Sequence, residues 1–599
     1  MSITTLCRNS LVFLLVAPGA LSAASPPEIK PPAEPLATLR PEHPRLMLPA
    51  SALQALKARA AEDKTLARYV QQVLAQAEKL LAAPALTYDK QGPRLLHVSR
   101  ECLRRTYALA LAYRWTGETR FAEAARGNLV TVCNFKDWND SHFLDVAEMS
   151  HAVAIGYDWL NDWLDAGTKE LLVAKLIEYG LQEGIEEYEA WTGWPDSEHN
   201  WNQVCNSGLI IGALAIAETR PDYAERILPL ACKSLPHALV TYAPDGAWPE
   251  GPSYWEYATN YTAHGLGALN TALGTDFGLS KFPGMAETGL FPVYATGATG
   301  LFLNFADSGE RNKRDTAACM FWLAKTYNNS TISDLEHAAL EQHEATPQHV
   351  MWYLPPSGKE PALDLDRLFR GPVPVAVFRS AWDDPNALFV GVKGGYNQVN
   401  HGHLDLGNFE LDALGVRWAR DLGSDDYNLP GYFAKMPGGK RWQYYRMRSA
   451  SHNVPLMNGH DQRVLAEATV ADFKRGKSPS VTIDLSGAYP GAKKVTRRIS
   501  LVDKRTAVLC QDIFRLEQPA EIVWGMTTDA EIALNGQEAV LTQDGKRMTV
   551  TLVRPKGSEW SVESAEQPAP EKPNTGVSRL TARINAAAGQ QSFLVRFSW

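Results

Sequence analysis

The sequence lacks the features of several large protein classes. It contains no glycine-rich dinucleotide fingerprint and no phosphate-binding P-loop. After the first 25 residues, no apolar run is long enough for a membrane helix. The formal net charge of -8 gives no general basic surface, so binding of nucleic acid by bulk electrostatics is not expected. We therefore expect no organic cofactor, no nucleic-acid partner and no membrane insertion.

Cysteine is also scarce. After Cys7, the cysteines are Cys102, Cys133, Cys205, Cys232, Cys319 and Cys510. They form neither a CxxC metal motif nor the disulfide framework of a small secreted domain. We expect most of them to be small buried apolar residues, while the export expected below leaves one or two bridges open.

The N-terminal segment predicts export. Residues 1–25 combine Arg8, a short apolar core at residues 11–17 and small residues before Ser25, which is typical of a secretory signal peptide. We therefore expect a periplasmic or secreted protein. Residues 26–44 are rich in proline and alanine and predict a linker into the folded part.

The remaining chain is long enough for at least two hydrophobic cores, and its 45% hydrophobic and 21% charged residues are typical of globular proteins. Residues 45–370 are dominated by helical periodicity, as in residues 51–81 and 100–116, which place apolar side chains three and four positions apart. About ten or more helices in pairs, without a short repeated motif, favour an α/α toroid over a small bundle.

The periodicity changes near residue 371. Residues 371–599 alternate apolar and polar positions between turns such as Asn535-Gly536 and Asp544-Gly545. This pattern predicts a large antiparallel β-sandwich. The expected fold class is thus α+β and multidomain, with an N-terminal helical toroid that carries the substrate cleft and a C-terminal sandwich.

The most informative segment, residues 400–433, reads NHGHLDLGNFELDALGVRWARDLGSDDYNLPGYF. It opens with His401 and His403, which share one face if the segment is a strand of period two. A turn-rich loop with Asp421 and Tyr427 follows. This one segment supplies a candidate base, candidate metal ligands and phenols.

A second candidate lies at residues 198–208, where amides and a histidine precede an apolar helix. Asn and His at such positions often only cap the helix. Their density favours an anion-binding corner, in which His199 and Asn200, with Trp201 and Asn202, receive a substrate carboxylate at the helix N-terminus.

A third candidate is the turn-rich stretch at residues 244–257. It contains Trp248, Tyr254 and Tyr257, and a loop exposes such aromatics at a cost unless a ligand covers them. The alternative is that the tyrosines simply begin the next helix and pack against it.

Two further sets carry charge or metal-binding groups. The basic stretch with Arg441, Arg446 and Arg448 is either a solvated loop or, in an acidic protein, a contact for acidic sugar units, as Tyr427 also is. Two histidines and one carboxylate are compatible with zinc, although such groups often only hydrogen-bond a strand end. This metal set consists of His403, Asp421 and His452.

The motifs resemble those of a known family. His-Gly-His-Leu-Asp at residues 401–405, followed by Asp-Leu-Gly-Ser-Asp-Asp-Tyr at 421–427, is similar to the heparinase II/III-like polysaccharide lyases. The resemblance implies a helical toroid followed by a β-sandwich, and a structural zinc that braces the site. Glu-Gly-x-x-Tyr at residues 250–254 resembles the family's catalytic tyrosine motif. His199 and Asn200 are the nearest matches to its carboxylate-neutralising pair, although the order here is His-Asn.

The resemblance implies β-elimination on a uronate, in which the C5 proton is removed and O4 leaves. His401 is then the base for one C5 configuration and Tyr254 the acid, or Tyr254 serves as both acid and base when the two reacting groups lie on one face of the sugar. Tyr257 is the fallback tyrosine. Asn200 and His199 stabilise the charge that develops on the carboxylate. The expected partner is an anionic uronate polysaccharide or oligosaccharide, and the expected protein is a carbon–oxygen lyase, monomeric or homodimeric. Alginate, heparin or heparan, chondroitin or dermatan, ulvan and glucuronan all remain open.

Three alternatives remain at this stage. A uronyl C5-epimerase of the same fold uses the same residues and returns a proton to C5. A non-catalytic glycan-binding protein needs the aromatic and basic residues but not the histidines. A glycoside hydrolase needs two opposed carboxylates. Its candidates are Asp196, Glu198, Asp245, Glu250 and Glu256.

Overall fold

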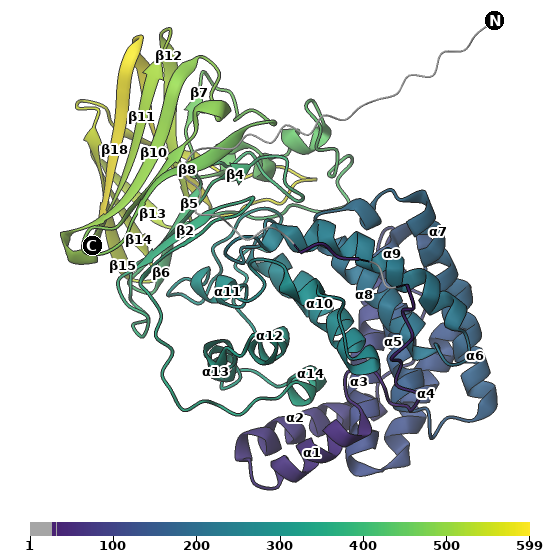
Figure 1. Cartoon of the computed structure of the whole chain (residues 1–599). Helices are drawn as coiled ribbons and strands as arrows, with labels where there is room; N and C mark the ends of the chain where they lie inside the picture. The colour runs from purple at the N-terminus through teal and green to yellow at the C-terminus, as the bar shows by residue number, and fades with distance from the viewer. Residues whose placement is uncertain (1–26, 31–32) are drawn as a thin grey trace, which may run out of the picture.

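The computed structural model describes residues 27–30 and 33–599. The expected signal peptide at residues 1–25 lies outside the described residues. A helical half is followed by a half made of strands, as Figure 1 shows in purple to teal and in green to yellow. Within the described ranges, no helix is both long enough and apolar enough to cross a bilayer.

The helical half begins with a helical pair. The single periodic stretch at residues 51–81 is two helices, because Asp63 accepts hydrogen bonds from the backbone N–H of Thr65 and Leu66 and so starts a new helix there. The α-helices are α1 (Ala50–Ala60), α2 (Lys64–Leu81), α3 (Leu96–Thr116), α4 (Thr119–Cys133), α5 (Phe143–Trp159), α6 (Ala166–Leu176), α7 (Gln182–Ala190), α8 (Asn200–Ala215), α9 (Pro221–Leu239), α10 (Pro252–Leu273), α11 (Leu290–Tyr294), α12 (Cys319–Tyr327), α13 (Ser330–Ala339) and α14 (Pro347–Met351).

Helices α3, α5, α8 and α10 pack side by side as an inner row, and α4, α6 and α9 cover the row from outside. All residues of α5 and nearly all of α8 are buried. Both helices are apolar around most of their circumference, as a helix enclosed by others must be. The result is the toroid of helical hairpins that the periodicity predicts.

The second half contains three antiparallel sheets around one core. A nine-stranded sheet has the order β13-β14-β15-β18-β11-β10-β9-β8-β4, a five-stranded sheet the order β1-β2-β3-β5-β6, and a four-stranded sheet the order β16-β17-β12-β7. The strands are β1 (Asp366–Phe369), β2 (Val375–Arg379), β3 (Phe389–Lys393), β4 (Gly395–Tyr396), β5 (Phe409–Ala413), β6 (Val416–Ala419), β7 (Leu456–Met457), β8 (Glu467–Lys474), β9 (Ser480–Asp484), β10 (Ala492–Val502), β11 (Ala507–Leu516), β12 (Ala520–Thr528), β13 (Glu531–Asn535), β14 (Glu538–Gln543), β15 (Lys546–Arg554), β16 (Trp560–Ser564), β17 (Ser578–Ala586) and β18 (Gly589–Ser598).

The antiparallel sandwich predicted from the alternation is confirmed, with differences in detail. β1 lies before the expected start of the β half at residue 371 and pairs with β2. β8 was not predicted, because most of its residues are exposed or half-buried and its sequence shows no apolar alternation. The six cysteines that the structure describes are all buried and free, so neither of the possible bridges is present among them.

Candidate active site

A cavity of about 530 Å³ lies where the helical half meets the loops of the β half. We call it the cleft. The helices of the inner row reach it with residues at or next to their N-terminal ends, and the positive ends of four helix dipoles therefore favour an anion there. Its lining residues are Arg94, Leu96, Arg100, His142, Leu144, His199, Asn200, Trp201, Tyr254, Tyr257, Asn400, His401, Tyr427 and Phe433.

A tight turn places the first tyrosine in the cleft. Gly251 adopts φ 91°, a conformation that residues with a Cβ atom rarely adopt, and Pro252 then begins α10. Tyr254 thus lies in the first turn of α10, where it faces the cleft. Both proposed tyrosines begin a helix and also line the cavity, so the two readings of this segment are compatible.

Tyr254 forms a compact group with two residues of the β half. Its hydroxyl lies 2.6 Å from the hydroxyl of Tyr427, which lies 3.4 Å from His401 Nδ1. The rings of Tyr254 and His401 are stacked with centroids 4.5 Å apart. Burial and the nearby Asp307 carboxylate raise the pKa of both phenols, so the tyrosines keep their protons at neutral pH.

Asp307, between α11 and α12, organises the histidines. Its carboxylate accepts from His401 Nδ1 at 2.8 Å and from His403 Nε2 at 2.9 Å. Tyr432 and Arg441 each donate to Asp307 Oδ1 at 2.8 Å. Burial alone would raise the pKa of Asp307, but Arg441 and the histidines hold it well below its usual range. The carboxylate therefore stays charged and fixes the histidine rings.

The prediction that His401 and His403 lie in a β-strand is wrong. His401 adopts the left-handed φ of 62°, and β5 begins only at Phe409. Both histidines face one carboxylate because of this turn, not because of strand alternation. A non-glycine residue held in this region is strained, and such strain is concentrated at functional sites.

The predicted anion-binding corner at His199 and Asn200 differs in the structure, because the Asn200 amide already has a partner. Asn200 Nδ2 lies 2.9 and 3.1 Å from the two oxygens of Glu250, and Asn400 Nδ2 lies 2.8 Å from one of them. The Asn200 amide is therefore already hydrogen-bonded to a carboxylate of the protein. His199 lines the same cavity, and its Nδ1 has no hydrogen-bond partner within the described part of the chain. Burial lowers the pKa of His199 to about 4, so the ring is neutral at pH 7.

Two residues expected to contact substrate do not reach the cleft. Asn202 is buried and donates to the backbone oxygen and hydroxyl of Ser234, both at 3.1 Å. Trp248 is fully buried and packs against Tyr242, with ring centroids 4.9 Å apart. Both positions stabilise the helical half, whereas Trp201 and Tyr257 do line the cleft.

The basic loop expected to bind acidic sugar units is also corrected. Arg441 is buried and pairs with Asp307, the carboxylate that also binds His401. Arg446 is buried as well and donates to Asn574 and Glu310. Their charges are used inside the protein, where a guanidinium needs partners to offset its lost hydration. Arg448 remains partly exposed and pairs with Asp461, outside the cleft.

The three expected metal ligands come together. His403, Asp421 and His452 are buried, and one ligand atom of each lies within 4.8 Å of the others. His403 Nδ1 and His452 Nε2 find no hydrogen-bond partner among residues 27–30 and 33–599. Buried imidazole nitrogens are normally paired. Two unpaired nitrogens beside a carboxylate fit a divalent cation such as zinc.

Sequence reasoning missed Arg94, Asp307 and the structural role of Glu250. The Arg94 guanidinium lies 5.6 Å from the centre of the Tyr427 ring and has no carboxylate partner in the described ranges. The only signal for Arg94 is a turn-forming Gly92-Pro93 before α3. Asp307 lies about a hundred residues from the histidines in sequence, so no local pattern connects them.

The cleft geometry disfavours the hydrolase alternative. Within the described residues, no aspartate or glutamate lines the cleft. Of the five candidate carboxylates, Glu250 comes nearest, but it is buried and bonded to two amides. Hydrolysis needs two carboxyl groups on opposite sides of the scissile bond.

Comparison with known proteins agrees with this architecture. Residues 384–592 match the family model described as heparinase II/III-like, C-terminal. No curated protein matches the chain. A heparinase III gene product is 15% identical with a TM-score of 0.60, over 96% of this chain and 94% of that one. The heparan sulfate lyase HepC of Pedobacter heparinus is 14% identical with a TM-score of 0.59, over 91% and 88%.

A third similar structure is the chondroitin AC lyase of Streptomyces coelicolor, at 13% identity and a TM-score of 0.50, over 92% of this chain and 82% of that one. At these identities, the likeness establishes the fold. Residues 384–592 thus belong to the heparinase II/III-like C-terminal domain family, in a chain whose two halves together have the toroid-and-sandwich fold of heparinase III.

Proposed function

We propose that the protein is a polysaccharide lyase that cleaves a uronate-containing glycan by β-elimination. The observation that carries the proposal is the contact of Tyr254, Tyr427 and His401 in a cleft without a lining carboxylate. This set supplies a proton donor and a base but no hydrolytic pair. The names of the similar structures, among them a heparan sulfate lyase and a chondroitin lyase, support the same reaction class.

Elimination needs a base for the C5 proton and an acid for O4. His401 Nδ1 donates to Asp307, which leaves Nε2 as the nitrogen able to take the C5 proton. The C5–H electrons form the C4–C5 double bond as the C4–O4 bond breaks. Tyr254 retains its proton because its pKa is raised, and it gives that proton to the departing O4.

The uronate carboxylate takes up negative charge as C5 loses its proton. The neutral His199 ring donates one hydrogen bond to it, and Arg94 adds a positive charge at the same cavity. Asn200 acts through Glu250, which holds the amide and Asn400 in place. A donor fixed in advance at developing charge, as His199 is here, contributes on the order of a hundredfold in rate.

The buried cluster of His403, Asp421 and His452 is assigned to zinc. Bound there, zinc would brace the loop of the β half that carries His401, as a structural ion. His403 also donates to Asp307, so the brace extends to the carboxylate that orients the base.

The test uses the ultraviolet absorbance of the unsaturated uronyl end. Uronate polysaccharides of different backbones are incubated with wild type and with Tyr254→Phe. Absorbance that rises on one polymer and not with the variant supports the lyase. A flat trace on all polymers contradicts it, and solvent deuterium at C5 without cleavage would instead identify an epimerase. We also propose export, from residues 1–25, which N-terminal sequencing of the mature protein tests.

A further inference from the structure

A segment that is neither helix nor strand, residues 36–48, crosses the helical half before α1 begins. We call it the strap. Arg40 donates its backbone N–H to the last turn of α10 at 2.8 Å, and Trp159, the last residue of α5, donates its indole N–H to the backbone oxygen of Leu46 at 2.9 Å. Both contacts lie at the C-terminal ends of inner-row helices, whereas the cleft lies at the N-terminal ends. The strap therefore fastens the row at the end that lies away from the cleft.

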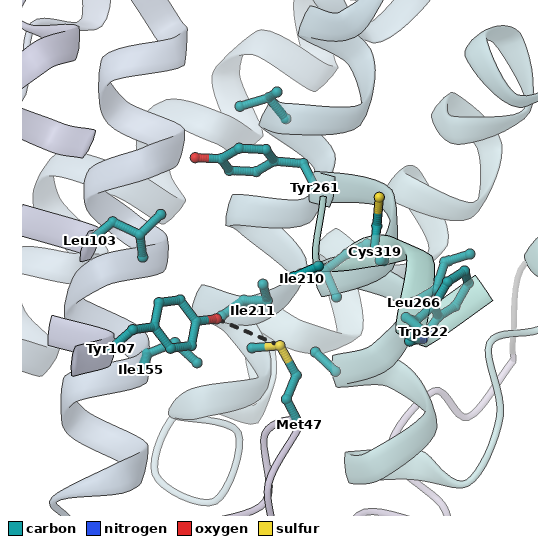
Figure 2. Packing of buried hydrophobic residues seen from close by; sticks show 14 of the residues in the cluster. Met47, Leu103, Tyr107, Ile155, Ile210, Ile211, Tyr261, Leu266, Cys319 and Trp322 are labelled. Atoms are coloured by element: carbon teal, nitrogen blue, oxygen red, sulfur yellow. Dashed lines mark hydrogen bonds between the residues drawn. The ribbon is translucent and has the colours of Figure 1, made fainter. Parts of the chain in front are cut away.

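Met47 anchors the strap in the core. Its side chain is buried, with the sulfur 3.6 Å from the hydroxyl of Tyr107 in α3, as Figure 2 shows. Its backbone N–H donates to Thr271 Oγ1 of α10 at 2.8 Å. Met47 adopts the left-handed φ of 58°, which is strained for a residue with a Cβ atom and persists only where surrounding contacts hold it. Weakening those contacts therefore favours release of the strap.

A buried carboxylate of α5 binds the strap. Asp158 is fully buried and accepts from the backbone N–H groups of Arg45 at 3.0 Å and Leu46 at 2.9 Å. His43 Nδ1 lies 2.6 Å from Asp158 Oδ1, and His43 Nε2 lies 3.0 Å from Oε1 of Glu218, just after α8. A neutral imidazole carries one N–H and can donate to only one of these carboxylates, whereas the protonated ring donates to both. Protonated His43 therefore joins α5 to the turn that follows α8.

Arg45 offers an alternative partner for the neutral ring. One of its terminal nitrogens lies 2.8 Å from His43 Nε2 and 2.9 Å from Glu218 Oε2. When Nε2 carries no proton it accepts from Arg45, and when it carries one it donates to Glu218 instead. The charged groups that touch the ring are thus two carboxylates and one guanidinium. A proton on His43 balances this largely buried cluster, while its loss leaves one negative charge uncompensated.

Other titratable groups pack around the cluster. Tyr157 lies edge-on to the ring, with centroids 5.5 Å apart, and is uncharged because burial raises its pKa to about 12. Arg114 of α3 lies near Asp158 and Asp162, whose charges oppose its own. Burial lowers the pKa of His43, but its hydrogen bonds to the two carboxylates outweigh that effect, so the pKa is raised above 6.5. The stability that protonation adds is therefore fully present below pH 6.5 and is lost as the pH rises through the raised pKa.

We infer that the strap is a pH-sensitive clamp on the inner row, which His43 closes when both of its ring nitrogens carry a proton. In the closed state the ring bridges Asp158 and Glu218, and so holds the strap, α5 and the turn after α8 together. Loss of one proton to water lets Arg45 take Nε2 as its partner, and the bridge to Glu218 opens. This device concerns the helical scaffold and does not depend on the proposed reaction.

Hydrogen exchange of the full-length protein tests the clamp. The amide protection of residues 40–47 is measured at pH 6 and pH 9 and corrected for the intrinsic exchange rate at each pH. In wild type the protection factor should fall about tenfold, because loss of one charge-assisted hydrogen bond changes an equilibrium by about that factor. His43→Gln cannot gain a proton and should show the same protection at both pH values. Constant protection in wild type, or an equal fall in His43→Gln, would overturn the inference.

Two further variants complete the test. Glu218→Gln keeps a hydrogen-bonding side chain but removes one carboxylate, so the pH at which protection falls should decrease. His237, which is partly exposed and lies 3.6 Å from Asp196, supplies the matched control. His237→Gln removes a similar ionisable pair outside the strap and should keep the wild-type profile. If Glu218→Gln keeps the wild-type midpoint, or His237→Gln moves it, His43 is not the switch.

Discussion

Replacing Tyr254 by phenylalanine separates catalysis from packing. The ring remains, so its stacking on His401, with centroids 4.5 Å apart, is kept. The lost hydroxyl makes one hydrogen bond, to Tyr427 at 2.6 Å. Loss of that bond costs about 1 kcal/mol, or about fivefold in an equilibrium. Loss of a proton donor to O4 costs about 100-fold or more in rate.

The matched control is Tyr427→Phe, which removes the same hydrogen bond from its other side. Both variants should unfold at similar urea concentrations, but only Tyr254→Phe should lose about 100-fold or more in the initial rate of unsaturated product. Tyr427→Phe should lose about tenfold or less, for one bond and the weaker contact to His401. If the two variants lose equal activity, or Tyr254→Phe loses only about fivefold, Tyr254 is not the acid.

Three further predictions follow from the same geometry. Metal analysis of purified wild type should find about one zinc per chain, and His452→Ala, but not the exposed His97→Ala, should lose it. Arg94→Gln should raise KM more than it lowers kcat, because Arg94 contacts a carboxylate that is present both before and during the reaction. A fall in kcat with KM unchanged would refute this. Burial raises the pKa of Glu256 from 4.5 to about 8. The folding stability that its protonation contributes is therefore fully present below pH 4.5 and lost as the pH rises through 8. The unfolding temperature of Glu256→Gln relative to wild type should therefore increase over that range, and a constant difference would contradict it.

The sequence predicted the two halves well because each rests on a local period. Helices α5 and α8 and strands β10 and β11 follow directly from runs of apolar residues at helical or alternating spacing. Where the local signal is weak, the prediction failed. β8 presents mostly exposed residues, and one Asp63 side chain divides a continuous helical pattern into two helices.

The site was predicted in part for the same reason. The sequence brought out Tyr254, His199 and the three metal ligands because unusual polar residues stand in short motifs. It could not show whether an arginine is free. Arg441 and Arg94 look alike in sequence, yet the first is buried against Asp307 and the second faces the cleft without a carboxylate partner in the described ranges.

The sequence by itself therefore determined the order of helices and strands and which residue types are available for chemistry. Only the tertiary structure decided that Asp307 orients His401 and that the Asn200 amide is hydrogen-bonded to Glu250. The physical reason is that the state of a charged or polar side chain depends on its partners and its burial. These partners are separated by tens to hundreds of residues, and no local period records their contact.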